Sequence, residues 1–147
     1  MRGLRVFRIG AWAWVATGLG HLATAVAIGL RPEDPAAARA LAAMREHGIE
    51  IAGVRRSLRD LDQGMSLVMA AALVFGGVVC LLVARSAPDL VTRSRTLSGL
   101  CLAGSLVVLG LSLWLLPLPP IVLFAVACVA FGQALGAARP EVSAQPA

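Results

Sequence analysis

The stretch IGAWAWVATGLGHLATAVAIGL, residues 9–30, decides the fold expected for this chain. As a helix, a run of this length rises about 1.5 Å per residue and spans roughly 33 Å, enough to cross the hydrocarbon core of a bilayer. Three further apolar runs follow, at residues 64–84, 96–116 and 121–138. The sequence therefore predicts an all-α fold, a four-helix transmembrane bundle.

Composition supports this fold class. Hydrophobic residues make up 59% of the chain and charged residues 14%, whereas soluble domains average about 25% charged residues. We expect residues 1–139 to form a single four-span membrane domain, and residues 140–147 to form a disordered tail.

The first run has a second interpretation, as a cleavable signal peptide. Arginines at positions 2, 5 and 8 precede it, and Ala23, Ala25 and Ala27 resemble the small residues of a cleavage site. A retained helix is favoured, because the run is long and no soluble domain is expected after it.

The one long polar stretch, residues 31–62, is expected to contain a short amphipathic helix. Asp34 is typical of an N-cap and Pro35 of a first helical position, so an alanine-rich helix is predicted from Pro35 to His47. Apolar residues then recur at helical spacing, at Ile51, Val54, Leu58, Leu61 and Met65. The second span is therefore expected to begin as an amphipathic helix before it enters the membrane.

The net charge is +5, and every lysine-or-arginine position in the chain is an arginine. Arginines beside apolar runs indicate anchoring to anionic lipid headgroups, and nucleic-acid binding is not expected. The basic N-terminus and the turn at 85–95 fall on one side of the membrane, so the positive-inside rule puts both termini in the cytoplasm. The high content of Ala, Leu, Gly and Val without lysine suggests a bacterial protein, and hence an inner (plasma) membrane.

Small residues predict where helices pack. Ala16, Gly20 and Thr24 form one such stripe on the first span. A second stripe lies on the third span and consists of Ser98, Cys101, Ser105, Val108 and Ser112. The cysteines, at 80, 101 and 128, have no CxxC spacing and are expected to be apolar fillers. With two histidines that are far apart, no metal or cofactor is expected.

His21 is the one ionisable side chain within the four runs, and it shares a helical face with Trp14, Thr17 and Thr24. At such a depth an ionisable group faces the bundle or a wet cavity, which makes these four residues a candidate ligand site. The alternative is a neutral imidazole that bonds a serine, a threonine or a carbonyl group on a neighbouring helix.

A second candidate group is Arg56, Asp60 and Gln63, which would share one face of a helix. These residues could form an ion-pair network at the end of a span. If the face turns inward, Asp60 could orient the imidazole of His21, and Arg56 could bind a carboxylate or phosphate.

Residues 10–67 resemble a group of small bacterial four-span membrane proteins. The resemblance rests on the pair Gly20-His21 and on a G-x-x-R-S-x-x-D-x-x-x-G pattern from Gly53 to Gly64. The first span also resembles the DoxX-like membrane proteins. The resemblance implies a four-helix bundle and points to His21, Arg56 and Asp60, but it implies no substrate. The chain departs from the group in lacking aromatic residues around 58–62, which counts against a stacking role there.

Three functions follow from these patterns. The first is binding of a lipid-like or quinone-like amphiphile, or an accessory role in a homo-oligomer or larger membrane complex. The second is a small membrane enzyme, with His21 as catalytic acid or base, Asp60 as its partner and Arg56 as an anion anchor. The third is a purely structural membrane protein in which His21 is buried and inert.

Overall fold

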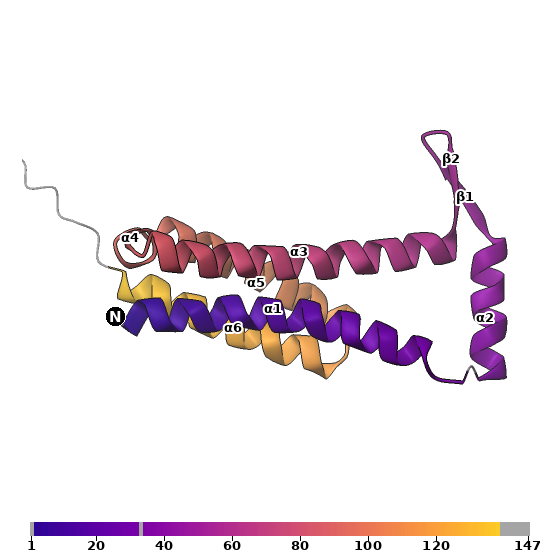
Figure 1. The fold of residues 1–147 in the computed structure, drawn as a ribbon, viewed down its shortest axis with the longest axis horizontal. Helices are drawn as coiled ribbons and strands as arrows, with labels where there is room; N and C mark the ends of the chain where they lie inside the picture. Colours follow the sequence, from indigo (N-terminus) through magenta and orange to yellow (C-terminus); the bar gives the residue numbers. More distant parts are fainter. Residues whose placement is uncertain (1, 33, 139–147) are drawn as a thin grey trace, which may run out of the picture. The chain divides into compact units, whose positions relative to one another are not determined.

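The structure is a computed structural model that describes residues 2–32 and 34–138, so the predicted tail at 140–147 lies outside the described residues. Figure 1 shows the course of the chain. Its elements are α1 (Arg2–Gly29), α2 (Pro35–Glu46), β1 (Gly48–Ile51), β2 (Val54–Ser57), α3 (Leu58–Ser86), α4 (Asp89–Thr92), α5 (Thr96–Leu115) and α6 (Leu118–Ala137). Four of these helices, α1, α3, α5 and α6, are long and apolar enough to cross a membrane, which confirms the predicted fold class.

Two of the long helices extend past the apolar runs from which they were predicted. Helices α1 and α3 have 28 and 29 residues, or roughly 42 Å and 44 Å at about 1.5 Å per residue. A hydrocarbon core of about 30 Å leaves their charged ends in the headgroup region. Helices α5 and α6 have 20 residues each and match the core thickness.

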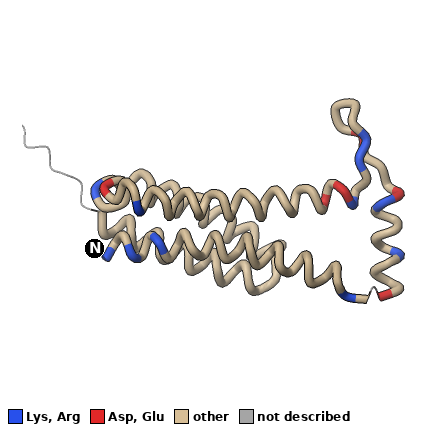
Figure 2. The backbone as a smooth tube through the Cα atoms, in the orientation of Figure 1, with Lys and Arg blue, Asp and Glu red and all other residues tan. Residues whose placement is uncertain are grey.

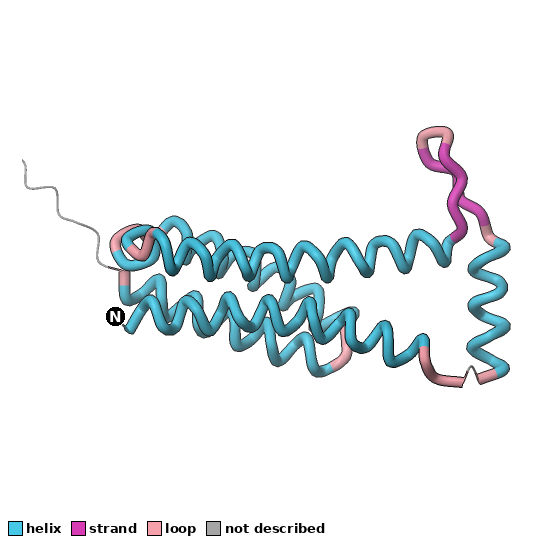
Figure 3. Tube along the Cα trace, viewed as in Figure 1, coloured by secondary structure: helices cyan, strands magenta, loops and turns pink. Residues whose placement is uncertain are grey.

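The segment that leads into α3 differs from its prediction. Strands β1 and β2 form an antiparallel hairpin in which Gly48 pairs with Ser57 and Ile51 with Val54 (Figure 3). Its turn has positive φ at Ala52 (51°) and Gly53 (78°), the conformation that two-residue hairpin turns require. The prediction that the second helix starts near residue 51 was therefore wrong. Ile51 and Val54 are also apolar and β-branched, and such residues favour strands as well.

Helix α2 has the predicted start, with Asp34 at the N-cap in extended conformation and Pro35 in the first turn. It ends at Glu46, and His47 is its C-cap. None of its residues, all of which the structure describes, is buried. That α2 is amphipathic therefore stays a prediction.

The chain divides into two compact units. Among the described residues, the first comprises 2–17 and 73–138, and the second comprises 18–32 and 34–72. Helices α1 and α3 contribute to both units, α4, α5 and α6 belong to the first, and α2 with the hairpin belongs to the second.

Aromatic side chains hold the core of the first unit together. The ring of Phe131 on α6 meets Phe7 and Trp14 of α1 edge to face, at centroid distances of 5.2 and 5.4 Å. Trp14 Nε1 also donates a hydrogen bond of 3.0 Å to Ser105 Oγ on α5. One indole therefore links α1 to both α5 and α6.

The polar stripe predicted on the third span packs as expected. Ser98, Cys101, Ser105 and Ser112 are buried, and Val108 is half-buried. The Sγ atom of Cys101 lies 3.7 Å from that of Cys80, so these two cysteines are small fillers where α5 meets α3. The stripe predicted on α1 is different: Ala16, Gly20 and Thr24 are exposed.

One end of the first unit carries its charged side chains, and we call it the arginine-rich end. It comprises Arg2, Arg5, Arg8, Arg85, Arg93 and Arg95, together with Asp89. Arg8 Nη2 donates a hydrogen bond of 3.2 Å to the carbonyl of Ala84, which joins the start of α1 to the end of α3. Helices α5 and α6 carry no acidic or basic side chain (Figure 2).

Helices α1 and α3 approach each other closely at Gly77. A Cβ atom at this position would lie 2.8 Å from the carbonyl oxygen of Ala11 and 2.6 Å from Val15 Cγ2. Because one of these neighbours is backbone, a side chain here would force the two helices apart.

We therefore expect Gly77→Ala to destabilise the protein by about 1–3 kcal/mol, the usual cost of overpacking. Thermal unfolding of the detergent-purified protein measures the effect. Gly104→Ala on α5 is the matched control, because a Cβ there meets nothing within 4 Å. An unchanged melting temperature for Gly77→Ala would contradict the close contact.

Candidate functional site

His21 on α1 contacts Ser66 on α3 within the second unit. His21 Nε2 and Ser66 Oγ form a hydrogen bond of 2.5 Å, and both side chains are half-buried. The imidazole or the hydroxyl group can be the donor, depending on the tautomer. This is the arrangement expected for a neutral imidazole that bonds a serine on a neighbouring helix.

A pocket of about 250 Å³ opens beside this hydrogen bond, and we call it the His21 pocket. It is lined by His21, Thr24, Ala25, Ile28, Arg59, Asp62, Gln63, Ser66 and Leu67. Its lining combines polar groups that can donate and accept hydrogen bonds with three apolar side chains. Sites for whole small molecules measure about 300–1,000 Å³, so this pocket fits the polar end of a longer molecule.

The charges at this pocket neutralise each other. Arg59 Nη1 and Asp62 Oδ2 lie 3.5 Å apart and form an ion pair along α3. The side chains are 34% and 61% exposed, so the pair adds little to stability. With no net charge, the pocket is suited to a neutral polar group rather than to an anion.

Arg56 and Asp60 do not line the His21 pocket. They line a separate pocket of about 510 Å³, together with Leu61, Gly64, Met65, Val68 and Met69. The prediction that Arg56, Asp60 and Gln63 share a helical face was wrong, because Arg56 lies on strand β2, opposite Ile49. Gln63 instead joins His21 and Thr24.

The Ser57-x-x-Asp60 part of the sequence pattern forms a capping box at the start of α3. The backbone N–H of Asp60 donates to Ser57 Oγ at 3.1 Å, and the backbone N–H of Ser57 donates to Asp60 Oδ2 at 3.3 Å. This reciprocal pair satisfies N–H groups that a helix start leaves free. It gives Asp60 a structural role that needs no ligand.

The other residues of the predicted His21 face have separate partners. Trp14 bonds Ser105, and Thr17 Oγ1 donates to the carbonyl of Ala13 at 2.8 Å, both within the first unit. Thr24 Oγ1 donates to the carbonyl of Gly20 at 2.8 Å, and Thr24 lines the His21 pocket. Of the face predicted on α1, the structure therefore brings His21 and Thr24 together at one pocket.

Ser66, Arg59 and Asp62 are pocket residues that the sequence patterns did not single out. A signal for them exists, because residues 59, 62, 63, 66 and 67 lie at the spacing of one helical face. That face becomes visible once α3 is known to begin at Leu58.

The four apolar helices make this chain a multi-pass helical membrane protein. Comparisons with protein-family models, with curated proteins and with solved structures found no match. Among residues 2–32 and 34–138, no group of three or more His, Cys, Asp or Glu side chains is placed to hold a metal ion. Any proposal on function therefore rests on the geometry of the pockets.

If Asp60 acts as a helix cap, Ser57→Ala and Asp60→Ala should weaken the start of α3 alike. We expect each to cost about 0.5–2 kcal/mol locally, seen as faster amide hydrogen exchange in residues 58–61. Asp62→Ala serves as the control, because it removes an exposed ion pair and leaves the cap intact. Normal exchange in Asp60→Ala would contradict the capping role.

Proposed function

We propose that this protein, in a bacterial inner membrane, binds the polar end of a lipid-like or quinone-like amphiphile at the His21 pocket. The observation that carries the proposal is the hydrogen bond between His21 and Ser66 beside a pocket with both polar and apolar walls. Polar groups within apolar helices are costly in a membrane, so they tend to mark binding or transport functions.

The pocket's chemistry supports a neutral headgroup. The imidazole of His21, the hydroxyl of Ser66 and the amide of Gln63 can all donate to a carbonyl or hydroxyl oxygen. Ala25, Ile28 and Leu67 provide the apolar wall that the adjoining part of an amphiphile needs. Because the pocket is small, the apolar chain of the ligand would extend out of it into the bilayer.

The geometry favours binding over catalysis by the residues first considered. An enzyme that uses His21 with Asp60 and Arg56 requires those side chains at one site. Asp60 is engaged in the capping box, and both residues line a different pocket from His21.

We also propose that both termini face the cytoplasm. The basic segments 2–8 and 85–95 contain six arginines and one acid, whereas residues 31–62 contain six of each. The excess positive charge of the short segments therefore lies at the arginine-rich end. The positive-inside rule counts arginines in short loops most heavily, which supports a cytoplasmic position for this end.

Removal of the hydrogen-bonding groups tests the proposed site. We expect His21→Ala and Ser66→Ala each to weaken binding of a short-chain benzoquinone or of diacylglycerol about tenfold, because one lost buried hydrogen bond costs about 1–3 kcal/mol. Native mass spectrometry of the full chain in detergent measures the bound fraction.

His47→Gln is the matched control, since His47 is exposed at the C-cap of α2 and outside the pocket. Melting temperatures separate loss of binding from loss of fold. If the wild type binds neither amphiphile, or if both pocket variants bind as the wild type does, the proposal fails.

A further inference from the structure

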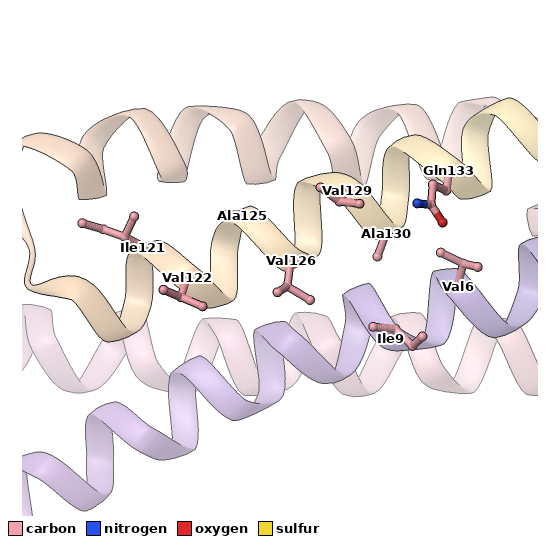
Figure 4. A pocket seen from close by; sticks show the side chains of 9 residues that line it. All are labelled: Val6, Ile9, Ile121, Val122, Ala125, Val126, Val129, Ala130 and Gln133. Carbon is pink, nitrogen blue, oxygen red and sulfur yellow. The ribbon is translucent and has the colours of Figure 1, made fainter.

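The first unit contains two pockets of its own, and neither shares a residue with the His21 pocket. An apolar groove of about 520 Å³ runs between α1 and α6. It is lined by Val6, Ile9, Ile121, Val122, Ala125, Val126, Val129, Ala130 and Gln133. Figure 4 shows Val126 and Ala130 pointing from α6 toward Val6 and Ile9 on α1. Gln133 is the one polar side chain in this lining.

A separate polar pocket of about 510 Å³ lies at the arginine-rich end and is lined by residues of α1, α4 and α6. It contains Arg2 and Gly3, which lie one turn before Val6 on α1, and Ala134 and Ala137, which follow Gln133 on α6. The helices run antiparallel here, because Gly3 lies against Ala137 while Phe7 packs on Phe131. The apolar groove and the polar pocket therefore follow one another along α1 and α6, and α4 adds Val91 and Thr92 to the polar pocket.

Two arginines lie on α1 about one turn before the residues that line the groove. Arg2 and Arg5 are exposed, and each lies four residues before a groove residue, Val6 or Ile9. Within residues 2–32 and 34–138, neither has an ion-pair or side-chain hydrogen-bond partner. Their guanidinium groups are therefore available to an anionic ligand, and the arginine-rich end around them has one acid, Asp89.

The groove is long enough to hold an acyl chain. Its lining on α6 extends from Ile121 to Gln133, roughly 18 Å at about 1.5 Å per residue. Half of a hydrocarbon core measures about 15 Å. Because α6 spans Leu118–Ala137 and matches the core thickness, this lining is centred on the helix, so an acyl chain that enters at the arginine-rich end would extend past the bilayer midplane.

We propose that an anionic phospholipid binds along α1 and α6. One acyl chain lies in the apolar groove, the phosphate contacts Arg2 and Arg5, and Gln133 donates to an ester carbonyl between them. Each part of the lipid meets the side chains that suit its chemistry. A zwitterionic lipid carries the same phosphate together with a compensating ammonium group, so the two arginines favour a lipid of net negative charge.

The experiment compares dioleoyl phosphatidylglycerol with dioleoyl phosphatidylcholine on the detergent-solubilised full chain, by native mass spectrometry. The wild type should retain phosphatidylglycerol preferentially. Arg2→Gln and Arg5→Gln should each weaken phosphatidylglycerol binding about fivefold and weaken phosphatidylcholine binding less, so that the preference between the two lipids falls. Arg31→Gln is the charge-matched control, because Arg31 lies in the second unit.

A larger side chain in the groove tests separately whether an acyl chain binds there. Ala125→Phe should reduce retention of both lipids, whereas Ala103→Phe on an exposed face of α5 should reduce neither. Equal binding of the two lipids by the wild type would overturn the proposal, as would a retained preference in the Arg2→Gln/Arg5→Gln double variant. If Ala125→Phe changes the oligomeric mass and leaves lipid retention intact, the groove is a contact between chains and the proposal is wrong.

Discussion

The absence of water from a bilayer core is the constraint on which this structure depends. Each backbone N–H and C=O group in the core needs a partner within the protein, and a helix supplies it within one segment. Side-chain hydroxyls obey the same constraint. Thr17 and Ser112 donate to carbonyls four residues earlier in their own helices, and Ser105 accepts from Trp14. These three side chains have partners close by, whereas the His21 pocket places polar groups beside an open cavity.

Helix positions could be predicted largely from apolar run length, because that length is set by the bilayer itself. Helix α5 ends within one residue of its predicted end. Helix α6 begins at Leu118 and not at Ile121, since Pro119 and Pro120 fit the first turn, where no N–H partner is required. The hairpin before α3 was not predicted. Its apolar residues satisfy helical spacing, and the turn at Ala52 and Gly53 depends on backbone conformation that spacing does not report.

The candidate site was predicted in part. His21 could be identified from sequence, because an ionisable residue within an apolar membrane span is rare and often functional. Its partner was not, because Ser66 on α3 is 45 residues away and serine is common in membrane helices. Asp60 was predicted as a site residue because it is a carboxylate near a span. Its hydrogen bonds to Ser57 show instead that it caps the start of α3. A capping box can be recognised from sequence when the helix start is placed correctly, and here the start was predicted about seven residues too early.

Four helices are long and apolar enough to cross the bilayer, and we propose that the arginine-rich end faces the cytoplasm. Site-directed labelling tests it in a variant whose native cysteines are replaced by alanine. Single cysteines are placed by Ser94→Cys, between α4 and α5, and by Glu50→Cys, on β1. In intact cells, a membrane-impermeant maleimide should label the cysteine at position 50, and should label that at position 94 only after permeabilisation. Labelling of both positions from the same side would contradict the account.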